Sequence, residues 1–253
     1  MTDAVRIRDD RGLRRLTLDR AEKMNALNTA MMRALTAAVE AAPNDGIELL
    51  VIEGAGERGF CVGGDVAEMR RGGTVFAEQE EALRALIVAL HTAAVPVICL
   101  VHGRTLGAGC IIASLSDVVL AADNLHFGFP EMRFGLYPAF VHGAILERVS
   151  NAMAFQLCIG GRILSAAEAL SFGFVTEVLS AEGFANHAAG RIAHYRERID
   201  ALVMGRRIRH MALPDSMAAR MAELAPLLLE NHEAPSARRL LAEMPFARPA
   251  GGA

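Results

Sequence analysis

The sequence has no surplus of basic residues: 26 lysines and arginines stand against 29 aspartates and glutamates, for a formal net charge of −3. Without a positive surplus there is no electrostatic footprint for nucleic acid or for an anionic membrane. The chain also lacks an uninterrupted apolar stretch of about eighteen residues, the length that a membrane-spanning helix needs. Its first residues contain no apolar run of signal-peptide length. We therefore expect a soluble, cytoplasmic protein that binds neither nucleic acid nor membranes.

Cysteine is scarce as well, with four residues that lie far apart at Cys61, Cys99, Cys110 and Cys158. None has the C-x-x-C or Cys–His spacing of a metal site, so we expect buried thiols in a reducing compartment and no bound metal. What the sequence does have is apolar residues, which make up 53% of its 253 positions. That content predicts a sizeable core, either as one α/β domain or as a core with a small appendage.

Strand and helix patterns alternate through the first half of the chain. The predicted strands cover residues 5–8, 13–18, 49–53, 97–101 and 118–121, and the predicted helices cover 29–42, 76–91 and 108–115. Such alternation is typical of an α/β fold with parallel strand pairing. After Pro138 the pattern becomes mainly helical, with a capping box at Ser165–Glu168. From Glu182 onward the chain reads as helical throughout, and this tail has to pack on the core or on a neighbouring subunit.

Two glycine-rich segments each follow a predicted buried strand. Residues 54–59 match G-x-G-x-x-G, but no helix begins within those glycines, which argues against a dinucleotide site. Further on, Gly63 and Gly64 let a ligand approach the backbone, and the N–H of Val62 is expected to be free where the strand ends. The second segment, 107–109, opens a helix whose first N–H groups lack partners and whose dipole favours negative charge. By itself the first segment also fits a plain surface loop, but two such donors together make an oxyanion hole.

Glu131 stands in a strongly apolar stretch, close to Phe127, Phe129 and Phe134. Burial raises the pKa of a carboxyl group and makes it a stronger base. The alternative is a capping glutamate, or one that forms a salt bridge with Arg133. The formation of an enolate and its later protonation require backbone N–H donors and a single basic carboxylate.

Taken together, these segments resemble the crotonase superfamily of enoyl-CoA hydratases and isomerases over nearly the whole chain. The matching segments are Leu18-Asp19-Arg20 with Lys23-Met24-Asn25-Ala26-Leu27, Gly59 to Asp65, His102 to Cys110, Gly128-Phe129-Pro130-Glu131 with Gly135-Leu136-Tyr137-Pro138, and Gly161-Arg162 with Gly173-Phe174-Val175. The resemblance implies an α/β fold, a crotonase-like spiral of ββα units with a helical C-terminal region. Residues 1–195 would form the core that binds acyl-CoA, and residues 196–253 the region that assembles a homotrimer or a dimer of trimers. Coenzyme A would enter as part of the thioester substrate, with no other tightly bound cofactor.

Site residues follow from the resemblance position by position. The N–H groups of Val62 and Ala108 would hold the thioester oxygen, and Glu131 would be the catalytic carboxylate. The implied substrate- and CoA-binding residues are Lys23, Met24, Ala26, Gly63, Gly64, Asp65, Val66, Gly107, Ile111, Pro130, Tyr137, Phe140 and His142. Two departures concern the reaction: Ile111 stands where hydratases of the family carry a second glutamate, and residues 139–142 replace their usual Gly-x-Gly-Gly.

One carboxylate is enough for Δ3,Δ2-enoyl-CoA isomerisation, in which a base removes the C2 proton and returns it at C4 of the dienolate. The sequence therefore predicts an isomerase-type enzyme in which Glu131 moves the proton. Hydration of a 2-enoyl-CoA is the alternative, and a non-catalytic crotonase-like binding protein is a second one. Hydrolase and decarboxylase chemistry also remain open, because one enolate-stabilising site supports many reactions. The sequence does not specify the acyl group.

Overall fold

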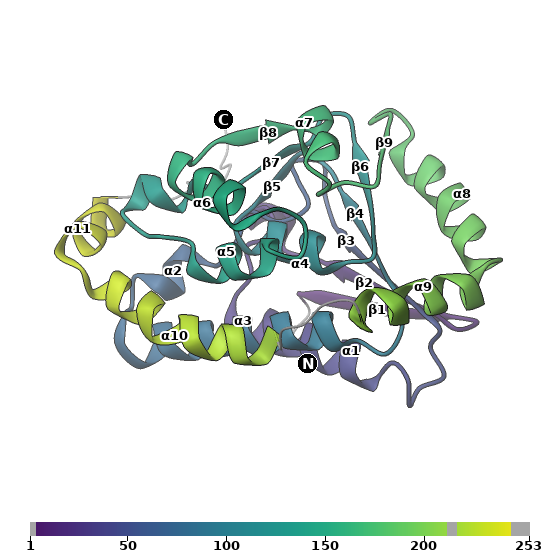
Figure 1. Cartoon of the computed structure of the whole chain (residues 1–253), viewed down its shortest axis with the longest axis horizontal. Coiled ribbons are helices and arrows are strands. Elements are labelled where there is room, and N and C mark those ends of the chain that lie inside the picture. The colour runs from purple at the N-terminus through teal and green to yellow at the C-terminus, as the bar shows by residue number, and fades with distance from the viewer. Residues whose placement is uncertain (1–3, 212–216, 244–253) are drawn as a thin grey trace.

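Strands and helices alternate along the computed structural model, which describes residues 4–211 and 217–243 (Figure 1). The strands are β1 (Val5–Asp10), β2 (Leu13–Leu18), β3 (Leu49–Gly54), β4 (Val97–Val101), β5 (Arg104–Leu106), β6 (Val118–Ala122), β7 (His126–Gly128), β8 (Ile163–Ser165) and β9 (Glu177–Leu179). The helices are α1 (Thr29–Ala41), α2 (Val66–Met69), α3 (Gly73–Thr92), α4 (Ala108–Leu115), α5 (Ala139–Ile145), α6 (Asn151–Gly160), α7 (Ala166–Ser171), α8 (Phe184–Arg196), α9 (Ile199–Met211), α10 (Met217–Glu233) and α11 (Pro235–Glu243), with 3-10 helices η1 (Ala21–Lys23) and η2 (Pro130–Phe134). Across the two described ranges, no helix combines the length and apolarity that a membrane span requires.

The larger sheet has six strands in the order β1-β2-β3-β4-β6-β9. β1 and β2 form an antiparallel hairpin that turns at Arg11 and Gly12, whose φ angles are 45° and 80°. From β2 to β9, all neighbouring strands pair in parallel. β4 and β6 are buried along their whole length, as expected for parallel strands covered on both faces. The predicted α/β arrangement with parallel pairing is confirmed.

The two faces of this sheet belong to different parts of the core. Because side chains alternate along a strand, Ile98 and Leu100 of β4 face α8 and the start of α9. Val97 and Val101 point the opposite way, into the main apolar cluster with α1, α3 and α4. All four cysteines are buried and free, as predicted. Burial raises the pKa of the Cys61 thiol to about 12, which makes it unreactive at neutral pH.

A second sheet, β5-β7-β8, has strands of three residues each, too short to leave a periodic signal in the sequence. Isolated bridges join Gly59 to Gly103 and Cys61 to Thr105, so the loop after β3 runs beside β5. An ideal Cβ on Gly59 would lie 2.4 Å from the carbonyl oxygen of Arg104, which is why only glycine fits there. The chain thus adds one strand to the larger sheet and one to the smaller sheet before a helix follows, as with β4, β5 and α4. This order is in keeping with the ββα repeat that the resemblance implies.

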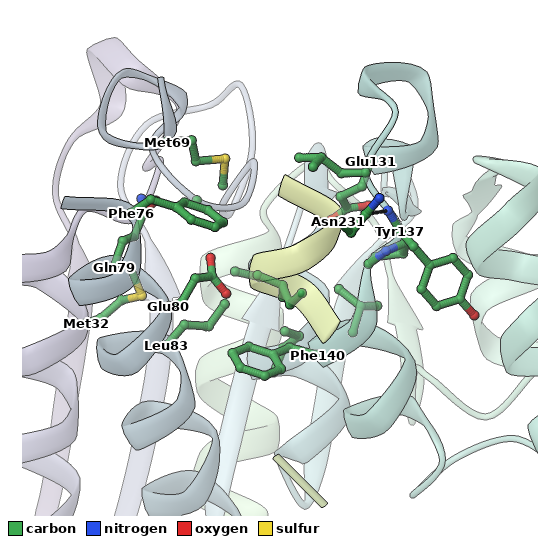
Figure 2. A pocket seen from close by; sticks show the side chains of 17 residues that line it. Met32, Met69, Phe76, Gln79, Glu80, Leu83, Glu131, Tyr137, Phe140 and Asn231 are labelled. Carbon is green, nitrogen blue, oxygen red and sulfur yellow. Dashed lines mark hydrogen bonds between the residues drawn. The ribbon is translucent and has the colours of Figure 1, made fainter. Parts of the chain in front are cut away.

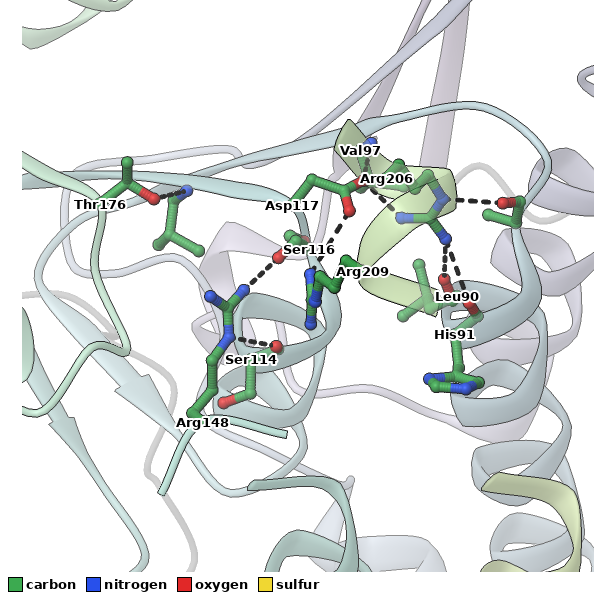
Figure 3. A network of polar contacts seen from close by, with 12 residues as sticks. Leu90, His91, Val97, Ser114, Ser116, Asp117, Arg148, Thr176, Arg206 and Arg209 are labelled. Atoms are coloured by element: carbon green, nitrogen blue, oxygen red, sulfur yellow. Dashed lines mark hydrogen bonds and ion pairs between the residues drawn. The ribbon is translucent and has the colours of Figure 1, made fainter. Parts of the chain in front are cut away.

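The C-terminal helices pack back on the core. α10 returns along α3 and α5, while α9 lies at the end of α3 (Figure 1). Arg206 of α9 is 6% exposed and donates to the carbonyl groups of Leu90, His91 and Ala93 at the end of α3. It also forms an ion pair with Asp117, which precedes β6 (Figure 3). The described part of the tail is helical as predicted, and its role in trimer formation stays a prediction.

Candidate active site

A cavity of about 80 Å³ lies between α3 on one side and η2, α5 and α10 on the other (Figure 2). Most of its wall is apolar and includes Met32, Met69, Phe76, Leu83, Ile111, Phe140 and Leu228. The polar side chains among its lining residues are Gln79, Glu80, Glu131, Tyr137 and Asn231. The fold therefore brings two carboxyl groups, which are 51 residues apart in the sequence, into one apolar cavity.

Glu131 occupies the second position of η2, directly after Pro130. Its Oε2 atom is buried and has no hydrogen-bond partner among the described residues. Burial raises the pKa of this carboxyl to about 7, against a smaller lowering by a hydrogen bond from its own backbone. In the part of the chain that the structure describes, no ion pair joins it to Arg133. The geometry therefore favours the basic carboxylate of the sequence analysis over the salt-bridged alternative.

The backbone donors beside Glu131 differ from the predicted pair in one member. The N–H of Val62 donates to the carbonyl of Met24 at 3.2 Å, so the prediction that it is free is wrong. Two residues later, Gly64 lines the cavity, and its N–H has no acceptor in residues 4–211 and 217–243. Ala108 also lines the cavity and begins α4, where a first-turn N–H has no intrahelical partner. The two N–H groups at the cavity are therefore those of Gly64 and Ala108.

The two glycine-rich segments meet directly beside Glu131. The N–H of Leu106 donates to the carbonyl of Cys61 at 2.8 Å, which places one segment against the other. An ideal Cβ on Gly63 would lie 3.6 Å from the nitrogen of Ala108. One on Gly107 would lie 2.5 Å from Oε1 of Glu131. Glycine at 107 is therefore what allows the carboxylate to approach the start of α4.

The second carboxyl group in the cavity, Glu80, was not singled out by the sequence analysis. It is 8% exposed, and its Oε2 has no hydrogen-bond partner within the described ranges. Burial raises its pKa to about 8. A signal was available, because Phe76, Leu83 and Ile87 mark the apolar face of the predicted helix and Glu80 falls on that face at i+4 from Phe76.

Tyr137 and His142 were expected to face the acyl pocket. The backbone end of Tyr137 borders the cavity, but its ring points away from it (Figure 2). The Tyr137 hydroxyl instead contacts Nδ1 of His142, whose Nε2 contacts the side-chain oxygen of Asn151 at 2.7 Å. His142 is not among the residues that line the cavity, so that expectation is wrong for His142 and for the Tyr137 hydroxyl. Phe140 and Ile111 do line the cavity, and their contact with the substrate stays a prediction.

The residues expected to contact CoA cluster around η1 and the start of α2, next to the cavity and outside its lining. Met24 ends η1 in a left-handed conformation with φ 50°, Ala26 is buried beside it, and Lys23 is exposed. Asp65 caps α2 through the N–H of Ala67, as predicted. The other residues predicted to bind the substrate, Gly63, Val66, Gly107 and Pro130, are likewise absent from the lining of the cavity. CoA contact stays a prediction for all of them.

Asn25 fixes the position of this turn and was not assigned a role from the sequence. Its side chain is fully buried and donates to the carbonyls of Ala55, Gly59 and Phe60. Its side-chain oxygen accepts from the N–H of Arg20 at 2.9 Å. The turn is thereby held against the first glycine-rich segment, the one that carries Gly64.

The model of the enoyl-CoA hydratase/isomerase family matches residues 8–225. The chain is 36% identical over 170 residues to the crotonyl-CoA hydratase of Syntrophomonas wolfei, over 66% of this chain and 65% of the relative. It is 33% identical over 224 residues to a probable enoyl-CoA hydratase of Rhodobacter capsulatus, over 86% of this chain and 85% of the relative.

Solved structures share the fold over nearly the whole length. An enoyl-CoA hydratase/isomerase of Mycobacterium paratuberculosis matches with a TM-score of 0.86 at 22% identity, over 96% of this chain and 99% of that chain. OdaA of Pseudomonas aeruginosa matches with a TM-score of 0.82 at 25% identity, over 95% and 98%. The predicted crotonase-like fold is confirmed.

Proposed function

Because the chain belongs to the enoyl-CoA hydratase/isomerase family of the crotonase superfamily, we propose that it converts a 3-enoyl-CoA into the 2-enoyl-CoA. The observation that carries this proposal is the position of Glu131, a buried and unpaired carboxylate beside the free N–H groups of Gly64 and Ala108. The family acts on thioesters of coenzyme A, so the substrate supplies the CoA and no second cofactor is required.

In the proposed reaction, the thioester oxygen accepts hydrogen bonds from Gly64 and Ala108. Ionised Glu131 removes a proton from C2, and the electron pair of that C–H bond spreads over the dienolate and its oxygen. The two donors stabilise the negative charge that develops there, and removal of one such donor typically costs about 3–4 kcal/mol. Protonation at C4 then leaves the double bond between C2 and C3 and restores the carbonyl group. No water is consumed, which suits a cavity with mainly apolar walls.

Hydration of a 2-enoyl-CoA is the second candidate. Two observations favour it: the curated relatives carry hydratase names, and Glu80 provides a second carboxyl group in the cavity. Against it, Ile111 places an apolar side chain on α4, inside the same wall. The two reactions differ in whether the product gains an oxygen atom.

One assay separates the two candidates. We expect the purified protein to convert a medium-chain 3-enoyl-CoA into the 2-enoyl-CoA in H₂¹⁸O without a gain in mass, as followed by mass spectrometry. Incorporation of ¹⁸O into a 2-enoyl-CoA supplied separately would replace isomerisation by hydration as the main activity. No conversion of either substrate would contradict both candidates and leave the non-catalytic, crotonase-like binding protein.

A substitution at Gly107 tests the approach of Glu131 to the donors. Gly107→Ala is expected to lower kcat by about 10²-fold, the usual effect of displacing a reacting group by about 1 Å. The added methyl would collide with the Glu131 carboxylate, and φ of 51° with ψ of −118° disfavours alanine. The matched control is Gly173→Ala, at a φ of 80° with no atom within 4 Å of an ideal Cβ. Equal activity of the two variants would contradict the assignment.

Location and assembly complete the proposal. We propose a cytoplasmic location and a homotrimer or dimer of trimers, in which residues 196–253 would form subunit contacts. α10 already contributes Leu228 and Asn231 to the cavity of its own chain. Light scattering after size-exclusion chromatography decides the oligomeric state.

A further inference from the structure

Glu80 and Glu131 reach the same cavity from different walls. Glu131 comes from η2, whereas Glu80 comes from the middle of α3 and directs its carboxyl group into the cavity (Figure 2). One oxygen of each group, Oε2, is buried without a protein partner among the described residues. Both carboxyl groups line the same cavity, so an acyl group bound there lies between walls that carry one carboxyl group each.

Among residues 4–211 and 217–243, no charged group compensates Glu80. The elements packed on α3 in this region are α1, α2, α4 and α10, and they contribute Met32, Met69, Ile111, Leu228 and Asn231 to the lining. The remaining titratable lining groups are Glu131 and Tyr137, and the Tyr137 hydroxyl is bound to His142 away from the cavity. Within the described residues, no cation and no hydrogen-bond donor therefore offsets the burial of Glu80.

Such burial is costly for folding, because a carboxyl group loses its hydration and gains nothing in return. The neighbouring Gln79 differs in part. Its Oε1 is also buried without a partner among the described residues, but its amide nitrogen donates to the carbonyls of Asp65 at 3.2 Å and Leu27 at 3.5 Å. Those contacts tie Gln79 to the loop that carries Gly64, which gives it a structural role. Glu80 has no comparable contact, so its position is explained by a partner that arrives with the substrate.

We infer that Glu80 is a second catalytic residue, which delivers the proton to C4 of the dienolate after Glu131 has taken the proton from C2. This inference rests on the proposed isomerase function. The C2–H bond breaks and its proton passes to Glu131. The C3–C4 π electrons then form the new C4–H bond with the proton of Glu80, the C2–C3 double bond forms and the carbonyl is restored. Glu80 ends ionised and Glu131 protonated, and one proton passed back through solvent resets the site.

The protonation states of the two groups agree with this division. Burial raises the pKa of Glu131 to about 7 and that of Glu80 to about 8. Between those values Glu131 is mainly ionised and can act as a base, while Glu80 still holds its proton. kcat/KM should therefore rise as pH increases through the lower pKa and fall as pH increases beyond the higher one.

The test measures the two proton transfers separately. Exchange of the C2 proton of a 3-enoyl-CoA in D₂O reports the step of Glu131 alone, and formation of the 2-enoyl-CoA reports both steps. Glu80→Gln is expected to keep C2 exchange near the wild-type rate, to lower isomerisation by about 10²–10⁴-fold and to lose the alkaline fall in the pH profile. The matched control is Glu81→Gln, the same change one residue later on a side chain that is 62% exposed. We expect it to behave as wild type.

A folding measurement keeps the result from being ambiguous. Glu80→Leu removes the unpaired carboxyl group, and we expect its thermal unfolding midpoint to equal or exceed that of the wild type while isomerisation is lost. Isomerisation by Glu80→Gln at the wild-type rate would overturn the inference, and so would loss of C2 exchange together with a lowered unfolding midpoint. Failure of the proposed function is distinct, because the wild type itself would then not convert a 3-enoyl-CoA into the 2-enoyl-CoA.

Discussion

Replacement of Glu131 by glutamine is expected to abolish both C2 exchange and isomerisation, with kcat lowered by about 10²–10⁴-fold. Glutamine fills the same volume beside Gly107 but cannot accept a proton, so the proposed oxyanion hole remains while the proposed base is lost. Steady-state kinetics with a 3-enoyl-CoA, together with exchange in D₂O, measure the effect. Folding should not suffer, because the substitution removes a buried carboxyl whose Oε2 has no partner among the described residues.

The pH dependence of the wild type gives a second measurement on the same residue. Burial raises the pKa of Glu131 to about 7, and a base works only when it is ionised. kcat/KM should therefore increase as pH rises from about 6 toward 7.5, and the residual activity of Glu131→Gln should lack this increase. A wild-type level of turnover in that variant would contradict the central assignment.

Replacement of Arg206 by methionine is expected to lower the free energy of unfolding by about 3–5 kcal/mol, the usual cost of removing one partner of a buried ion pair. The side chains of Arg206 and Asp117 are 4% and 7% exposed (Figure 3). Without Arg206, the Asp117 carboxylate would keep the N–H of Val97 at 2.8 Å. The last carbonyl groups of α3 would lose the guanidinium of Arg206. A cation at a helix C-terminus is stabilising, so this loss adds to the cost.

Urea unfolding with an unchanged m-value measures this loss, and the midpoint temperature should fall by roughly 6–20 °C, at about 2–4 °C per kcal/mol for a chain near this size. Arg209→Met is the control. Its guanidinium lies 3.4 Å from the same carboxylate, but the side chain is 29% exposed, so we expect a loss below about 1 kcal/mol. If the two variants lose the same free energy of unfolding, the ion pair between Arg206 and Asp117 does not hold α9 on the core.

The locally determined features were predictable because they depend on residues close together in the sequence. Asn28 accepts from the N–H of Met31 at the start of α1, and Ser165 and Glu168 form the expected capping box. The apolar runs of β4 and β6 and the helix start at Ala108 follow from the same local rules. Glu131 was identifiable because its neighbours in the sequence are apolar, whereas its place beside Gly107 comes from a segment more than twenty residues away.

Tertiary structure decided the features that depend on contacts between distant segments. Val62 was predicted to donate to the substrate, but the η1 turn brings the carbonyl of Met24 to its N–H, which leaves Gly64 at the cavity. His142 turns toward Tyr137 and Asn151 because α5 and α6 pack together. β5, β7 and β8 form because the chain passes beside itself, which three-residue strands do not reveal in advance.

The sequence by itself determined the fold class, the helix starts and one candidate catalytic carboxylate, because these depend on periodicity, capping and immediate neighbours. It also showed that position 111 holds isoleucine instead of a second carboxylate. Only the tertiary structure placed Glu80 in the same cavity as Glu131, since α3 and η2 come together through packing between residues far apart in the chain. The sequence shows which chemical groups are present, and packing decides which of them lose water and face one another.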